Sequence, residues 1–103
     1  MGAMLPTTVT QYLTSPSLSL YADDAVVTDD GKTYRGRDEI GDWLGSAARE
    51  YTYTTELIST RQIDASTYVA VNHLEGNFPG GSVDLQYTFT LENDLITRLV
   101  IAP

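Results

Sequence analysis

The segment LYADDAVVTDDGKTYRGRDEIGDWL, residues 20–44, carries the pattern that decides the fold. Two acidic pairs, Asp23-Asp24 and Asp29-Asp30, flank a β-prone stretch at residues 25–28. The Asp-Gly pair at 30–31 is a hairpin turn signal, so residues 32–34 are expected to return as a second short strand. Gly36 then interrupts the chain, and residues 38–50 are predicted to form a helix with one apolar face.

The regions on either side of this segment predict helices before it and strands after it. Residues 7–14 carry apolar side chains at helical spacing, and residues 17–21 form a short second helix at most. After Glu50, β-branched and aromatic residues dominate four stretches separated by turn signals, at residues 51–60, 67–78, 82–92 and 95–102. The predicted fold class is therefore α+β, with helices packed on one face of an antiparallel sheet. We expect one domain over residues 4–103 and an expression scar at residues 1–3.

The composition excludes several classes of function. The formal net charge of −8 opposes binding to nucleic acid and to anionic membrane surfaces. No apolar run reaches the length of a membrane span and no signal peptide is visible, so a cytoplasmic location is expected. The lack of cysteine excludes disulfides and thiolate chemistry, and a single histidine cannot build a multi-histidine metal site. With no phosphate-binding loop or metal motif either, we expect no metal and no cofactor.

The phase of the strand at residues 25–28 gives Asp29 two interpretations. Asp29 shares a face with Ala25 and Val27, because side chains alternate along a strand. If that face is internal, Asp29 is a carboxylate in an apolar setting, which suits a general base. The alternative is that Asp29 and Asp30 only open the turn before Gly31, as aspartate often does.

The string YADDAVVTD, a glycine turn, and then YRGRDEIGDWL resemble the nuclear transport factor 2-like superfamily, above all its ketosteroid isomerases and SnoaL-like polyketide cyclases. The order of elements fits along nearly the whole chain. The resemblance implies helices packed on a strongly curved antiparallel sheet, of the cystatin-like type, that forms a cone around an apolar pocket. Only eight residues separate Tyr12 from Tyr21, so the N-terminal helices are shortened relative to the family.

The resemblance also implies catalytic residues. Asp29 matches the proton-shuttling aspartate that ketosteroid isomerases carry at the end of the first strand. Tyr12 matches the hydrogen-bond donor on their first helix. The second donor, an aspartate on a late strand, is replaced here by Tyr87, which departs from the pattern but can still donate a hydrogen bond.

Other residues are candidates for the pocket wall or for its outer surface. By matching to the family, Asn72 and Leu74 face the cone, and His73 lies on the outer face, where packing or a subunit contact is expected rather than catalysis. For Trp43 and Phe89 a place in the core is the alternative to ligand contact. The candidate substrate-binding residues are Val27, Trp43, Tyr53, Asn72, Leu74, Leu85, Phe89 and Leu99.

Two functions of different classes follow. One is a cofactor-independent isomerase, cyclase or dehydratase that uses Asp29 as the base on a small, hydrophobic, carbonyl-bearing substrate. The other is a non-catalytic ligand-binding or dimerisation module of the same fold. A homodimer is expected in either case, through the outer face of the sheet, because that face carries Val69, Val71 and other apolar side chains.

Overall fold

The computed structural model of the chain describes residues 5–50 and 52–103, so the expected scar at residues 1–3 lies outside the described residues. The described residues form two α-helices, one 3₁₀ turn and six strands. In order they are α1 (Thr7–Thr14), η1 (Leu18–Leu20), β1 (Tyr21–Asp29), β2 (Lys32–Arg35), α2 (Gly36–Glu50), β3 (Tyr53–Gln62), β4 (Thr67–Gly76), β5 (Ser82–Glu92) and β6 (Leu95–Ala102).

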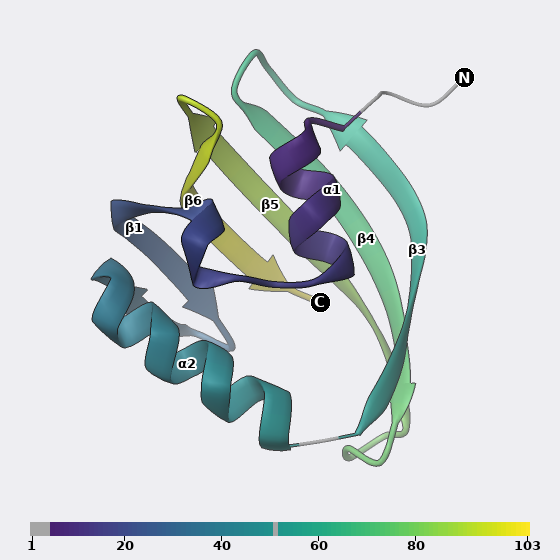
Figure 1. The fold of residues 1–103 in the computed structure, drawn as a ribbon. Helices are drawn as coiled ribbons and strands as arrows, with labels where there is room; N and C mark the ends of the chain where they lie inside the picture. The colour runs from purple at the N-terminus through teal and green to yellow at the C-terminus, as the bar shows by residue number, and fades with distance from the viewer. Residues whose placement is uncertain (1–4, 51) are drawn as a thin grey trace.

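The six strands form one strongly curved, unclosed sheet in the order β2-β1-β6-β5-β4-β3. Both helices lie on its concave side, with α1 in front of β4 and β5 and α2 beside β1 (Figure 1). The predicted α+β cone is confirmed. One detail differs from the antiparallel sheet that was expected, because β1 and β6 pair in parallel and make the sheet mixed. Residue patterns within a strand carry no information about which distant strand becomes its neighbour.

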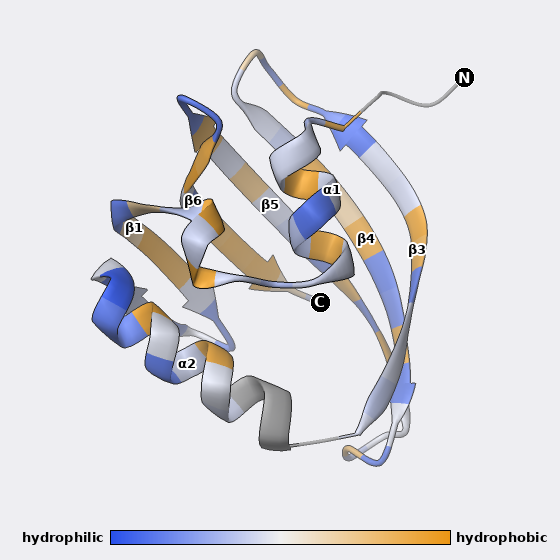
Figure 2. Cartoon of the chain, viewed as in Figure 1, coloured by the Kyte–Doolittle hydropathy of each residue, from blue (hydrophilic) through white to orange (hydrophobic). Residues whose placement is uncertain are grey.

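The core fills the space between the helices and the concave face. Figure 2 shows apolar bands on α1 and on the strands behind it. The largest side chains with almost no exposure are Tyr21, Phe89, Ile40, Ile96, Leu99, Val9 and Val27. α1 is further tied to the β5–β6 turn, since the Thr8 hydroxyl donates to the Asp94 carbonyl at 2.6 Å. Neither helix, over the residues described, has the length and hydropathy of a membrane span.

Glycine is required at Gly76, where the end of β4 lies against the start of β3. A Cβ at Gly76 would overlap the Thr52 carbonyl oxygen and would lie 2.6 Å from the Tyr53 Cβ. We expect Gly76→Ala to lower the free energy of unfolding by about 1–3 kcal/mol, because the backbone must move to make room. Gly41→Ala in α2 is the matched control. Its Cβ would meet only Leu18 Cδ2 at 3.4 Å, and alanine favours the helix. Urea unfolding measures both, and equal effects would contradict the prediction.

Candidate functional site

Asp29 lies at the end of β1 with its side chain on the concave face. Asp29 pairs with Ile101 on β6, and Ile101 pairs with Tyr87 on β5, so the three residues form one row across the sheet. Paired residues in neighbouring strands share a face, and this row faces the helices with the buried Val27 row beside it. Asp30 instead takes the left-handed conformation of the turn, with φ 54°, and is exposed. The hairpin turn is therefore made by Asp30, and Asp29 remains available to the interior.

Trp43 of α2 holds the Asp29 carboxylate in place. The indole Nε1 donates to Asp29 Oδ2 at 3.1 Å, and Trp43 is 9% exposed. The ring also lies near Tyr34 of β2, with centroids 5.9 Å apart. Among the described residues this is the one side-chain donor to the carboxylate, so the other oxygen can accept a proton or a hydrogen bond. Trp43, expected either in the core or against a ligand, therefore orients the candidate base.

Two buried tyrosines form a hydrogen-bonded pair between α1 and β1. The Tyr21 hydroxyl donates to the Tyr12 hydroxyl at 2.6 Å, and the rings meet edge to face with centroids 5.4 Å apart. Burial is the main cause that raises the pKa of both phenols, and the charge of Asp29 raises that of Tyr12 further. Both groups therefore stay neutral at physiological pH. Because Tyr12 accepts from Tyr21, its own hydrogen is the one left to donate.

Tyr87 is the second candidate donor on the concave face. Burial raises its pKa to about 12, with smaller contributions from Tyr53 and Asp29, while a hydrogen bond with the Asn72 side chain lowers it in part. Its ring stacks on Phe89 with centroids 6.3 Å apart. Phe89 in turn meets Tyr12 edge to face at 5.6 Å. Packing through Phe89 thus links the two candidate donors, and the charge of Asp29 acts on the pKa of both.

The remaining candidate contact residues divide into a core group and an accessible group. Val27, Phe89 and Leu99 are fully buried, which favours the core role that was the alternative for Phe89. Asn72 and Leu74 face the concave side and are nearly buried. Leu85 is half-buried, and Tyr53 on β3 is 42% exposed, so these two can touch a ligand without rearrangement.

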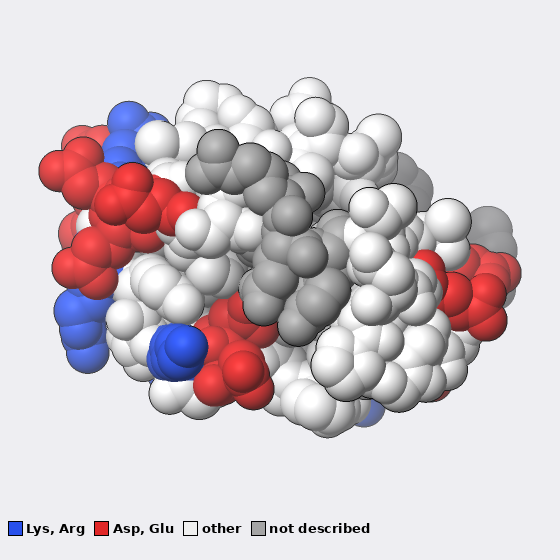
Figure 3. Space-filling model, turned by 90° about the horizontal axis from the view of Figure 1, so that it is seen from below, with Lys and Arg blue, Asp and Glu red and all other residues white. Residues whose placement is uncertain are grey.

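An open groove of about 710 Å³ lies between β2 and α2 and reaches Asp29. Its volume is in the range of small-molecule sites. Of the candidate site residues it includes Asp29 and Trp43, and not Tyr12 or Tyr87. Figure 3, which views the molecule from below, shows acidic side chains in separate groups, with Lys and Arg side chains beside some of them. The groove is lined by Asp29, Asp30, Lys32, Thr33, Tyr34, Glu39, Asp42, Trp43 and Ser46.

His73 lies on the outer face, as the family match predicts. Its Nδ1 is 2.6 Å from Asp84 Oδ1 and its Nε2 is 3.2 Å from Glu75 Oε1. These hydrogen bonds to the two carboxylates, that of Asp84 above all, raise the pKa of His73. The ring is thus occupied on the convex side of the sheet, away from the row of Asp29 and Tyr87. Within the described residues no cluster of three or more histidine and carboxylate side chains is arranged to hold a metal ion.

Sequence reasoning missed Tyr21 and Tyr34 as site residues. Tyr21 precedes an irregular part of β1, where the pairing with β6 moves from Tyr21–Ile96 to Val26–Arg98. Asp23 and Asp24 are exposed within that irregularity, and Asp23 forms an ion pair with Arg37 at 3.3 Å. In the sequence, the signal for Tyr21 was its even spacing from Ala25 and Val27, because residues at even spacing in a strand share a face. Tyr34 had no comparable signal, because its contact depends on where α2 packs.

The raised pKa values of Tyr12, Tyr21 and Tyr87 predict that stability depends on alkaline pH. A group whose folded pKa is raised contributes stability that is complete below its unfolded pKa and is lost as pH rises. Unfolded tyrosine ionises near pH 10, whereas folded Tyr87 ionises near pH 12. We therefore expect the urea midpoint to fall steadily above pH 10, with Tyr87 contributing at most about 3 kcal/mol. Tyr87→Phe should make the fall shallower, and an unchanged slope in this variant would contradict the assignment.

Comparison with known proteins supports the fold and identifies the family. No family model and no curated protein matches the sequence. Among solved structures, a candidate polyketide cyclase from Sinorhizobium meliloti is 30% identical, with a TM-score of 0.86 and 95% of each chain covered. A protein from Catenulispora acidiphila with a ketosteroid isomerase-like fold, in complex with trimethylamine, is 16% identical, with a TM-score of 0.80 over 97% of this chain and 87% of that one.

A third structure, TerC co-crystallised with polyporic acid, is 14% identical, with a TM-score of 0.71 over 92% of this chain and 84% of that one. At these two lower identities the likeness shows the fold alone. The first likeness spans nearly all of both chains at 30% identity, and the motif at residues 20–44 resembles the same family. The chain therefore belongs to the nuclear transport factor 2-like superfamily, in the group of the SnoaL-like and ketosteroid isomerase-like proteins.

Proposed function

We propose that the chain binds a small, hydrophobic, carbonyl-bearing molecule at the concave face and moves a proton next to its carbonyl group. The observation that carries the proposal is the position of Asp29. Its carboxylate faces the interior, is oriented by Trp43, and shares a face with the neutral donor Tyr87. Two structural relatives that were solved with small molecules, trimethylamine and polyporic acid, support binding of a small ligand by this fold.

The proposed chemistry needs a base and a donor that act on the same substrate. Asp29 removes a proton from the carbon next to the carbonyl, and the electron pair moves onto the carbonyl oxygen to form an enolate. A phenol of Tyr87 or Tyr12 donates a hydrogen bond to that oxygen, where charge develops in the transition state. Their raised pKa values keep both phenols protonated, as a donor must be. Asp29 then returns the proton to the same carbon or to a conjugated one, so the step balances without a cofactor.

Exchange of carbon-bound hydrogen tests this proposal without knowledge of the natural substrate. 2-Tetralone is a planar, hydrophobic ketone with acidic α-hydrogens, and loss of its α-proton signal in D₂O is followed by NMR. We expect the protein to speed this exchange over buffer alone, in proportion to protein concentration and with saturation in 2-tetralone. A rate equal to that of buffer containing an unrelated protein of similar charge would count against catalysis.

The second candidate function is a non-catalytic ligand-binding module. It is favoured by the groove between β2 and α2, where Asp29 and Trp43 lie among polar and charged side chains rather than in an apolar cavity. This function predicts saturable binding of an organic ligand, measured as a rise in the unfolding temperature, with no acceleration of exchange. The exchange assay and the thermal shift together separate the two functions.

A further inference from the structure

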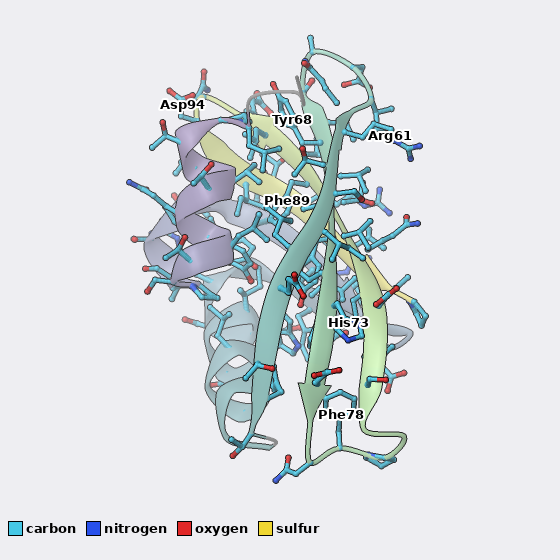
Figure 4. The ribbon with its side chains drawn as sticks, turned by 90° about the vertical axis from the view of Figure 1, so that its right-hand side faces the viewer. Arg61, Tyr68, His73, Phe78, Phe89 and Asp94 are labelled. Carbon is cyan, nitrogen blue, oxygen red and sulfur yellow. The ribbon has the colours of Figure 1, made fainter. Side chains whose placement is uncertain are left out.

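The largest exposed apolar side chains gather on β3 and just after it. Tyr53, Leu57, Ile58 and Ile63 are 42%, 48%, 50% and 51% exposed. β3 is also an edge strand, because the strand order ends with β4-β3. In Figure 4 it is the strand nearest the viewer, with no described element in front of it. An edge of ten residues leaves backbone N–H and C=O groups free to pair with another strand.

The sequence of β3 lacks two of the residues that usually protect an edge. Proteins commonly shield long edges with proline, lysine, other charged side chains or β-bulges, and β3 contains neither proline nor lysine. Its only charged side chains are Glu56 and Arg61. Glu56 pairs with His73 and Arg61 pairs with Val69, both on the outer face. Figure 4 shows Arg61 pointing away from the side of the sheet that carries the helices.

A β-bulge explains how Glu56 and Arg61 share a face. The pairing with β4 runs from Leu57–Asn72 directly to Ser59–Val71, so Ile58 is the extra residue. In a regular strand, two residues separated by an odd number of positions point to opposite faces. One bulge between them reverses that rule, and both charges then lie on the outer face.

The positions of Glu56 and Arg61 make β3 complementary in charge to a second copy of itself. When two copies of β3 pair antiparallel about a two-fold axis between Ile58 and Ser59, Glu56 faces Arg61 of the second copy, and Arg61 faces its Glu56. Leu57 then faces Thr60, and both of these residues are on the concave side, since they pair with Asn72 and Ala70. Directly opposed residues must share a face, and without the bulge this register would be forbidden. A self-complementary patch of this kind is what a two-fold interface requires.

We propose that β3 pairs edge to edge with β3 of a second copy of this chain, in the register that places Glu56 opposite Arg61. The interface joins two six-stranded sheets into one continuous sheet. The homodimer expected from the sequence is kept, but its place moves from the outer face to the edge. The reason is that Val69 is only 6% exposed, whereas the accessible large apolar side chains lie along β3.

Charge-reversal variants of Glu56 and Arg61 test both the interface and its register. We expect sedimentation equilibrium to show a dimer at tens of micromolar, and Glu56→Lys to raise the dissociation constant about tenfold or more, because it creates two like-charged pairs. Arg61→Glu should do the same, and the double variant Glu56→Lys/Arg61→Glu should restore dimerisation. Glu92→Lys, an equal charge change at the far end of β5, should leave the constant within about twofold. All positions are exposed, so circular dichroism is expected to show an unchanged fold.

Cross-linking provides a second measurement of the register. The chain has no cysteine, so introduced thiols are the only ones present. A mixture of Leu57→Cys and Thr60→Cys chains should form a disulfide-linked pair faster than either variant alone. A monomeric wild type would overturn the proposal. So would a dimer that Val71→Lys dissociates while Glu56→Lys and Arg61→Glu do not, because the outer face would then be the interface.

Discussion

Asp29→Asn is expected to reduce the protein-dependent exchange of the α-hydrogens of 2-tetralone by about 10²–10⁴-fold, the usual contribution of a general base. The amide oxygen of asparagine can still accept from Trp43 Nε1, so the position of the side chain is kept while its basicity is lost. The free energy of unfolding should stay the same or rise, because a half-buried charge is replaced by a neutral group. NMR exchange rates and urea unfolding measure the two effects.

Asp30→Asn is the matched control for this variant. Asp30 is the next residue, carries the same charge, and is exposed in the turn with φ 54°, a conformation that asparagine accepts readily. Exchange should therefore proceed at the wild-type rate. Equal losses in the two variants would show that Asp29 contributes only to the turn or to the general charge of the region, and the catalytic role would fail.

Phe89→Ala should cost about 3–5 kcal/mol of unfolding free energy, the largest stability effect that we expect from one substitution. Phe89 is fully buried in the middle of β5, and its ring contacts Tyr12 from α1 and stacks on Tyr87. Its removal leaves a cavity between α1 and the sheet. This is a large fraction of the about 5–15 kcal/mol that stabilises an ordinary domain.

Leu91→Ala is the control for Phe89→Ala, because it lies on the same strand and the same face but is half-buried. Its cost should be clearly smaller, as fewer contacts are lost. Chemical unfolding at one pH and temperature compares the two variants directly. A greater loss in Leu91→Ala would mean that the core is centred nearer the β5–β6 turn than the contacts of Phe89 indicate.

The elements that could be predicted from sequence are those whose signal is local. Helical spacing located α1, and clean alternation located β5 with its bounds at Ser82 and Glu92. The start of α2 at Gly36 and the end of β4 at Gly76 differ by two residues from expectation, because turn residues can extend an element when tertiary contacts favour it. The parallel pairing of β1 and β6 and the bulge at Ile58 depend on neighbours distant in sequence, so no local pattern predicts them.

In the candidate site, too, local patterns could be predicted from the sequence and contacts between elements could not. Strand phase placed Asp29 on the face of Val27, and the alternation of β5 placed Tyr87 with Phe89. The hydrogen bond from Trp43 to Asp29 could not be predicted, because it depends on the distance between α2 and the end of β1. The Tyr12–Tyr21 contact likewise joins two elements across the irregular part of β1. The face on which a side chain lies can be predicted from the sequence of one element. A contact between two elements can be predicted only when their relative positions are known.

Intermolecular NOEs to bound 2-naphthol test the central claim most directly. This phenol is a flat mimic of the enol of 2-tetralone, and its aromatic protons report which side chains surround it. A ligand between the candidate base and donors should show saturable binding, with NOEs to the rings of Tyr87 and Trp43 and to the Leu85 methyl groups. NOEs confined to outer-face residues such as Val71, or no saturable binding at millimolar concentration, would contradict a ligand site built around Asp29.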